Sequence, residues 1–380
     1  MKNTFFLFLF LISFSLTGQQ LSFSNSIISS QDKNVIELRE LWKSYLQDCV
    51  RSYIKKDKNI TSKYWNNEEI ENGFYNLVMY QVMPTVPLCL LGETVTFDIT
   101  KLDNDFYRIK SLVIQSDSIS KGIPVIFNVY AKQENEQFKF YSQFFISKSS
   151  LSIFSTKNIE YYYSSDFNFD KKEAKKAEKF YSKLLNDYDY SPKNKIKFIV
   201  AKNPETANNY IGFDHSIRSS TLKYSGYFLE EQNTILSGQI SHNHELVHSV
   251  FESKFPNAPQ LFNEGIATFM AGSNGESFNF HIEQLFKIMN SNQEADFSNF
   301  NDWNKLIDNS TNPYYTIGAV FIKYAFETGG SQKMISLFQY KNSKEDTYNA
   351  ISKELGIEQK GINSFLRNYV SELIQKKNFN

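Results

Sequence analysis

Apolar residues along this chain recur at two different spacings, and the change of spacing separates regions of different structure. Between Val35 and Ile54 they return every three or four positions, which predicts an amphipathic helix. The stretches that follow are rich in β-branched and aromatic residues and predict strands, at 95–99, 107–114, 123–130 and 138–146. A helix followed by antiparallel strands predicts an α+β accessory domain over residues 20–150.

A serine-rich polar segment at 147–152 interrupts this pattern and marks the expected boundary to a second domain at 155–380. The first part of the second domain combines a predicted helix at 171–186 with predicted strands at 159–163, 195–200, 224–229 and 234–236. From Ile240 onward the spacing is almost entirely helical. The second domain is therefore also predicted to be α+β, with a small sheet and a mostly helical C-terminal half.

The accessory domain offers few chemical clues. Its order of helix and strands is similar to that of the cone-shaped nuclear-transport-factor-2-like domains, but no motif accompanies this resemblance. Both cysteines of the chain, Cys49 and Cys89, lie in it. An oxidising compartment favours a disulfide between them, whereas two free buried thiols also fit the sequence, so both alternatives stay open.

The N-terminus has the pattern of a targeting segment. A positive charge at Lys2 precedes an apolar stretch from Phe5 to Phe14, and small or polar residues follow up to Gly18. This order is typical of a secretory signal peptide, here residues 1–18. The stretch is shorter than the roughly 20 apolar residues that a membrane-spanning helix needs. We therefore expect a secreted or periplasmic protein with no stable membrane span after removal of the signal.

Composition and charge narrow the function classes. Hydrophobic residues make up 41% of the chain, which is ample for a folded core and argues against disorder. Lys plus Arg equals Asp plus Glu at 41 each, so the chain has no electrostatic footprint for nucleic acid. We expect no nucleic-acid partner.

The histidines carry the strongest chemical signal. Three of the five in the chain lie between His242 and His248. His244 and His248 are four positions apart, so on a helix both rings project from one face within reach of one metal ion. Glu245 lies beside them, where its carboxylate can take a proton from water. This is the pattern of a zinc hydrolase.

A catalytic zinc ion needs a third protein ligand, and the positions shortly after His248 do not supply one. The extended metzincin spacing fails because Phe251 and Lys254 occupy its glycine and ligand positions. Glu252 continues the same helix face, but it lies roughly 12 Å along the helix from His244. We therefore interpret Glu252 either as a carboxylate that supports the site from outside the metal's own ligands or as an ordinary carboxylate of the helix.

Glu264 is the remaining candidate for the third ligand. Pro256 and Pro259 end the first helix and allow the chain to turn back. Small residues of the next helix, such as Gly265 and Ala267, are expected to let it approach the first helix closely. A glutamate on that helix then completes a site of two histidines and one glutamate, and Asn263 is a candidate for orienting a ligand.

These residues resemble the gluzincin metallopeptidases, the thermolysin-like group that includes the membrane alanyl aminopeptidase family and "peptidase MA-like" domains. The resemblance rests on His244–His248, on Asn263-Glu264-Gly265, and on Tyr315 followed by Gly318. It covers roughly residues 237–330 by motif and 158–380 by architecture.

The resemblance implies a thermolysin-like zinc domain that acts on a peptide or protein substrate. It also implies that His244, His248 and Glu264 bind Zn2+ and that Glu245 is the general base. Tyr315 matches the tyrosine that stabilises the oxyanion, and its neighbour Tyr314 is an alternative because the helix phase is not fixed.

The chain also departs from this family. The interval from His248 to Glu264 is shorter than in the aminopeptidases, and no Gly-x-Met-Glu-Asn element precedes the first helix. The corresponding region at 226–234 contains Glu230 and Glu231 but no Met. Exopeptidase and endopeptidase action therefore both stay open. A catalytically silent, zinc-stabilised binding or adhesion protein is the alternative function. Of the other histidines, His242 is expected to cap the helix or support the site, and His281 to pack in the core or donate to the oxyanion.

Overall fold

The computed structural model describes residues 20–80, 85–116, 121–217, 225–308 and 310–377. The predicted signal peptide lies outside these residues. The described chain has a mixed α/β fold with a curled sheet and a helical C-terminal half, which confirms the coarse prediction. It forms two compact units, and each takes residues from separate stretches of the sequence. The first comprises 20–153, 162–167 and 199–217, and the second comprises 154–161, 168–198 and 225–377.

The sheet of the first unit curls because its long strands are interrupted by bulges. Its order is β1(Gln20–Phe23), β2(Glu93–Lys101), β3(Phe106–Ser116), β4(Lys121–Glu134) and β5(Gln137–Tyr141), and β9(Phe213–Ser216) also pairs with β4. Only the pairing of β1 with β2 is parallel among these strands. The register shifts between Thr96 and Asp98 and again between Val113 and Gln115. Such shifts bend a strand and increase its twist.

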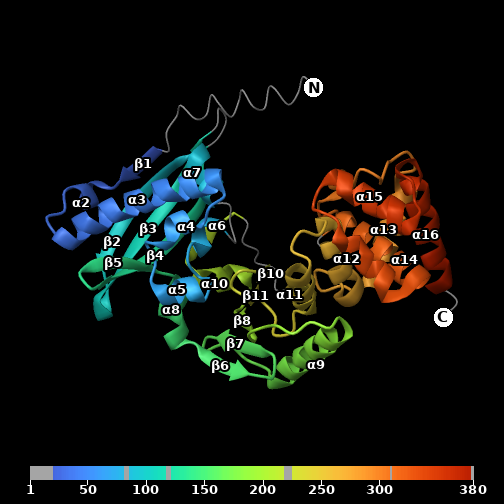
Figure 1. Cartoon of the computed structure of the whole chain (residues 1–380), viewed down its shortest axis with the longest axis horizontal. Helices are drawn as coiled ribbons and strands as arrows, with labels where there is room; N and C mark the ends of the chain where they lie inside the picture. Colours follow the sequence, from blue (N-terminus) through green and yellow to red (C-terminus); the bar gives the residue numbers. More distant parts are fainter. Residues whose placement is uncertain (1–19, 81–84, 117–120, 218–224, 309, 378–380) are drawn as a thin grey trace. The chain divides into compact units, whose positions relative to one another are not determined.

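The long helix α3(Lys33–Lys55) lies against this sheet and supplies the centre of its core (Figure 1). Trp42 is fully buried and contacts the rings of Phe127 and Phe140. Its indole N–H donates to the hydroxyl oxygens of Thr96 and Ser111, each at 3.0 Å. The only polar atom of the ring is thereby satisfied inside an apolar core, as burial requires.

Short helices complete the first unit: α2(Asn25–Ile28), α4(Asn59–Ser62), α5(Asn67–Glu71), α6(Leu77–Tyr80), α7(Thr85–Leu91), α8(Gln143–Ser147) and α10(Pro204–Asn209), with 3-10 turns η1(Asp103–Asp105) and η2(Lys148–Ser150). The predicted strand at 138–146 is wrong in its second half. The Ser142 hydroxyl accepts from the backbone N–H of Phe145 and caps α8 there. Cys49 and Cys89 are both buried, and the structure forms no disulfide between them.

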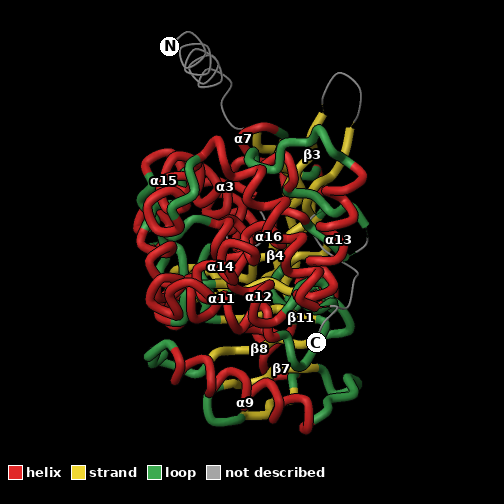
Figure 2. Tube along the Cα trace, turned by 90° about the vertical axis from the view of Figure 1, so that its right-hand side faces the viewer, coloured by secondary structure: helices red, strands yellow, loops and turns green. Residues whose placement is uncertain are grey.

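A small sheet lies mostly in the second unit. Its order is β10(Gly226–Leu229), β11(Thr234–Ser237), β8(Ile196–Val200), β7(Ile159–Tyr163) and β6(Ser152–Ser155), so β10 is an edge strand among the described strands. The helix α9(Lys171–Asp187) runs beside β7 and β8 in both ribbon views (Figures 1 and 2). Its apolar face, which includes Tyr181 and Leu184, is buried.

Helices make up the rest of this unit: α11(Asn243–Lys254), α12(Gln260–Ala271), α13(Phe278–Ser291), α14(Pro313–Ser336), α15(Lys344–Leu355) and α16(Ile362–Lys377), with 3-10 turns η3(Phe300–Trp303), η4(Leu337–Gln339) and η5(Gln359–Gly361). As predicted, two helices follow Ile240 and are separated by the segment that contains Pro256 and Pro259. The expectation that Gly265 brings α12 close to α11 is wrong, because the backbone against Gly265 is that of Gly318 on α14.

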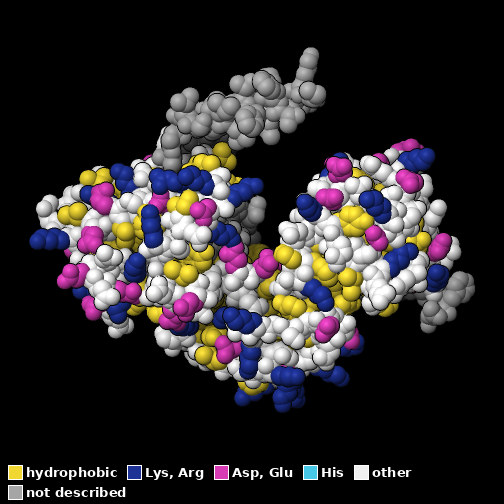
Figure 3. All heavy atoms as spheres, viewed as in Figure 1, with side chains coloured by type: hydrophobic (Ala, Val, Ile, Leu, Met, Phe, Trp, Pro, Cys, Tyr) yellow, Lys and Arg dark blue, Asp and Glu magenta, His cyan; other side chains and the backbone are white. Residues whose placement is uncertain are grey.

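The distribution of charged side chains over the surface agrees with the equal numbers of basic and acidic residues in the sequence. Basic and acidic side chains are interspersed over the face that Figure 3 shows, where lysines also gather over α9. In the described part of the chain, no helix is both long enough and apolar enough to cross a membrane.

Candidate metal centre

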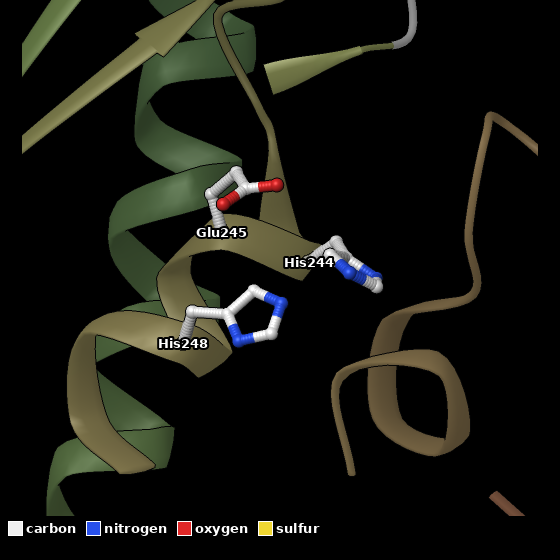
Figure 4. Close-up of side chains that lie close together, drawn as sticks. All are labelled: His244, Glu245 and His248. Atoms are coloured by element: carbon white, nitrogen blue, oxygen red, sulfur yellow. The ribbon is translucent and has the colours of Figure 1, made fainter. Parts of the chain in front are cut away.

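The helix α11 presents His244, Glu245 and His248 together (Figure 4). The helix begins at Asn243, so His244 and Glu245 lie in its first turn and His248 lies one turn further on. The three side chains offer ligand atoms that all lie within 4.8 Å of one another. The apolar residues between and after them are buried and fix the helix in the unit, namely Leu246, Val247 and Val250.

The two imidazole rings differ in what their Nδ1 atoms contact. Nδ1 of His244 lies 2.7 Å from the carbonyl oxygen of Gly272, so it carries the proton and donates it. Nδ1 of His248 lies 3.0 Å from Oε1 of Glu252, within ion-pair distance but without the geometry of a hydrogen bond. A partner at Nδ1 fixes the ring and directs Nε2 toward a metal, as in many zinc sites.

Glu264 reaches the two histidines from α12. Its Oε2 atom lies 3.5 Å from Nε2 of His244 and 3.5 Å from Nε2 of His248. Zinc bonds of about 2.0–2.2 Å in tetrahedral geometry separate two ligand atoms by roughly 3.3–3.6 Å. Both distances from Oε2 therefore match the separation of two ligands on one zinc ion. The donor set of two imidazole nitrogens and one carboxylate oxygen is also that of catalytic zinc, with one position left for water.

The electrostatics of Glu264 follow from its neighbours. Burial alone raises its pKa, but the charge of His248 and hydrogen bonds from both histidines outweigh burial and lower the pKa to about 2. His248 is also fully enclosed, and burial alone lowers its pKa. The charges of Glu264 and Glu252 act against burial and raise the pKa of this ring well above its ordinary value. The carboxylate is thus ionised and paired with a charged His248, and a metal that binds His248 must displace the proton of this ring.

Of the two candidate tyrosines, the structure brings Tyr315 onto the site. Its ring stacks over His244 with centroids 6.3 Å apart, and it lies close enough to Glu264 for the charge of that carboxylate to act on its hydroxyl. Burial and the charges of Glu264 and Glu245 raise its pKa, so the hydroxyl keeps its proton and remains a donor. Tyr314 instead lines a separate pocket of about 270 Å³ that also includes Gln260 and Tyr348.

Glu245 lies between the histidines and the edge strand β10. Its side chain is only 7% exposed. A Cβ atom added to Gly226 would lie 3.1 Å from Cγ of Glu245 and 2.8 Å from Nε2 of His242. Gly226 therefore lets the backbone of β10 pass directly beside the candidate general base. The sequence contains no feature that predicts this contact.

The other predicted residues are placed as follows. His242 stands at the N-cap of α11, but its side chain makes no capping hydrogen bond, and the ring is buried beside Gly226. Oδ1 of Asn263 is buried and has no hydrogen-bond partner among the described residues. The ring of His281 is buried, and its Nε2 lies 2.9 Å from the carbonyl oxygen of Ser273, so it donates to the backbone.

Sequence reasoning missed the Gly272 carbonyl, the acceptor that orients His244. A backbone acceptor has no side-chain signature. The available signal was Asn274-Gly275, which follows Gly272 after one residue and is a pair typical of tight turns. No protein-family model matches this chain, and a search of curated proteins finds no match either.

Proposed function

We propose that this chain is a zinc-dependent peptidase whose metal is held by His244, His248 and Glu264. The observation that supports this most directly is the position of the Glu264 carboxylate oxygen, 3.5 Å from both Nε2 atoms. Bound there, zinc would polarise the scissile carbonyl and lower the pKa of a water molecule.

The protein's own residues divide the remaining work. Glu245 is the general base, which takes a proton from the attacking water and returns it to the leaving amine. Its buried position between the histidines and β10 suits both transfers. The Tyr315 hydroxyl stabilises the negative charge that develops on the carbonyl oxygen. Its raised pKa supports this role, because a protonated phenol donates a hydrogen bond.

The substrate is a peptide or protein segment in extended conformation. The outer side of β10 is a sheet edge, where backbone groups can pair with an added strand. Gly226 places this edge against Glu245, so a peptide bound along β10 passes the general base. We further propose a thermolysin-like, gluzincin arrangement of this unit and export of the protein by the segment at 1–18.

Zinc analysis and peptide hydrolysis test this function together. The full chain would be purified, its zinc content measured, and its activity followed on quenched fluorescent peptides with free and with blocked amino termini. We expect bound zinc, hydrolysis, and loss of hydrolysis in Glu245→Gln with zinc retained. Glu294→Gln, a change at an exposed carboxylate, is the matched control and should keep full activity.

The outcomes separate the alternatives. Activity that survives in Glu245→Gln contradicts the assigned general base. A protein that binds zinc but hydrolyses no peptide is instead a zinc-stabilised binding protein. Hydrolysis restricted to peptides with a free amino terminus would identify an exopeptidase.

A further inference from the structure

The end of α12 connects the carboxylate ligand with one of the histidines. Glu264 lies within α12, and Gly272 terminates the same helix by donating its N–H to the Thr268 carbonyl at 2.9 Å. The carbonyl of Gly272 accepts from Nδ1 of His244 at 2.7 Å. One helix thus supplies a ligand directly and, through its last peptide group, orients a second ligand.

A tight turn fixes that peptide group. Gly272 has φ +76°, and a Cβ there would lie 2.0 Å from the Glu276 carbonyl oxygen, so no other residue fits. Ser273 and Glu276 exchange two backbone hydrogen bonds, at 3.0 and 2.9 Å. Between them Asn274 and Gly275 both have positive φ, at 50° and 84°, as a type I′ turn requires. The Ser273 N–H belongs to the same peptide group as the Gly272 carbonyl. The turn therefore restrains this group from its other end.

His281 holds the turn from inside the unit. The ring is 1% exposed, and its Nε2 atom donates to the Ser273 carbonyl at 2.9 Å. That carbonyl is the one that also accepts from Glu276. Nδ1 of His281 is buried without a hydrogen-bond partner among the described residues. A buried ring that leaves one nitrogen unpaired is costly in a core, where an apolar side chain of similar size would avoid the cost. A specific donor role for Nε2 accounts for a histidine at this position.

We propose that His281 is a positioning residue of the metal centre: through Ser273 it fixes the peptide group whose Gly272 carbonyl orients His244. The proposal rests on the proposed function, because orientation of His244 matters for a metal bound at its Nε2. His281 touches neither the metal nor the substrate. Of the two roles that the sequence suggested for His281, donation to the oxyanion is not open to Nε2, because this atom already donates to the backbone.

The test compares two substitutions that differ in the donor. His281→Gln places an amide N–H near the position of Nε2, whereas His281→Phe fills the space without a donor. Zinc affinity of the full chain would be measured by competition with a chromophoric chelator, beside urea unfolding of the metal-free proteins. We expect about a tenfold loss of zinc affinity in His281→Phe, the low end of the effect of supporting residues. His281→Gln should restore affinity to within about threefold of the wild type, since it keeps one donor.

Gly275→Ala provides a second route if His281→Phe does not fold. This residue is exposed and has φ 84°, so a side chain strains the turn without opening the core. The Gly275→Ala substitution should also weaken zinc binding. Glu294→Gln, remote in sequence and exposed, should not.

Four results would overturn the proposal. If His281→Phe binds zinc as tightly as the wild type, His281 does not position the metal centre. Equal losses in the Gln and Phe variants show that ring packing, and not the donor, is what matters. Unchanged zinc affinity in Gly275→Ala shows that the turn does not position His244. A wild-type chain that binds no zinc contradicts the proposed function itself.

Discussion

Gly265 of α12 and Gly318 of α14 lie backbone against backbone. A Cβ on Gly318 would stand 2.1 Å from the Leu261 carbonyl oxygen, and one on Gly265 would stand 2.4 Å from the Gly318 carbonyl carbon. Glu264 precedes the first glycine, and Tyr315 lies one turn before the second on its helix. The close approach of the two glycines is therefore what brings the Tyr315 hydroxyl to the Glu264 carboxylate.

Replacing Gly318 with Ala should separate the two helices. The obstructing atom is a backbone oxygen, which cannot rotate away, so we expect a loss of about 3 kcal/mol in the free energy of unfolding. Peptide hydrolysis should fall further than the folded fraction does, since Tyr315 is displaced from Glu264. Urea unfolding and activity measure the two effects. Gly361→Ala is the control, because nothing lies within 4 Å of its Cβ position. Unchanged stability in Gly318→Ala would show that the helices do not pack so closely.

Removing the Tyr315 hydroxyl should slow the reaction while leaving the metal in place. Tyr315→Phe should lower kcat by about 100- to 1000-fold, the usual cost of losing one oxyanion donor. Zinc content should stay at the wild-type level, because the hydroxyl is not a ligand. Tyr314→Phe is the matched control on the adjacent residue and should remain close to wild type. A larger loss of kcat in Tyr314→Phe than in Tyr315→Phe would identify Tyr314 as the oxyanion donor.

Substitutions of Glu252 and Glu264 should lower the affinity for zinc to different extents. Glu252→Gln weakens the partner of His248 Nδ1 and should cost about 10- to 100-fold. Glu264→Gln removes the charged oxygen that lies 3.5 Å from both Nε2 atoms and should cost more than that. Chelator competition gives both values. The reverse order of the two losses is incompatible with Glu264 as the third ligand.

Glu178 on α9 should make the stability of the protein depend on pH. Its carboxylate accepts from the Thr156 hydroxyl at 2.5 Å, from the backbone and side-chain amides of Asn158 at 2.9 and 2.7 Å, and from the Ser182 hydroxyl at 2.6 Å. Burial alone raises the pKa of Glu178, but these hydrogen bonds outweigh burial and lower it below its ordinary value of 4.5.

A carboxylate with a lowered pKa in the folded state stabilises the fold above its ordinary pKa, and this stability is lost as the pH falls through the folded value. Glu178→Gln should therefore cost about 2 kcal/mol at pH 7, within the range for hydrogen bonds to a charged group. The difference from wild type should shrink below the ordinary pKa of 4.5. Urea unfolding across this range measures it. Glu173→Gln, whose ion pair with Lys176 lies on the surface of the same helix, should change little. A cost in Glu178→Gln that is the same at every pH would exclude the carboxylate charge as its cause.

The sequence predicted elements best where their apolar spacing was regular. The strand at 159–163 and the helix at 171–186 match β7(Ile159–Tyr163) and α9(Lys171–Asp187) to within a residue. It missed β9(Phe213–Ser216), because four residues with both central side chains exposed do not form an apolar run. It extended β5 too far, because the capping role of Ser142 depends on a local hydrogen bond.

At the candidate site, spacing along one helix was enough to place His244, Glu245 and His248 together. The phase between Tyr314 and Tyr315 was not predictable, because it depends on how α14 packs against α12 at Gly318. The supporting roles of Gly272 and Gly226 were not predictable for a different reason. Each acts through its backbone or through the absence of a side chain, which leaves no chemical pattern in the sequence.

The pairing of β9 with β4 has a consequence for the order of events during synthesis. Ile126 pairs with His215, which leaves the ribosome 89 residues later (215 − 126). Proteins begin to fold from the N-terminus while translation continues, at about 5–20 residues per second. The nascent first sheet must therefore wait several seconds with the Val125–Phe127 side of β4 unpaired. During that interval this edge of β4 is a template for pairing with another chain, and the synthesis of β9 removes it.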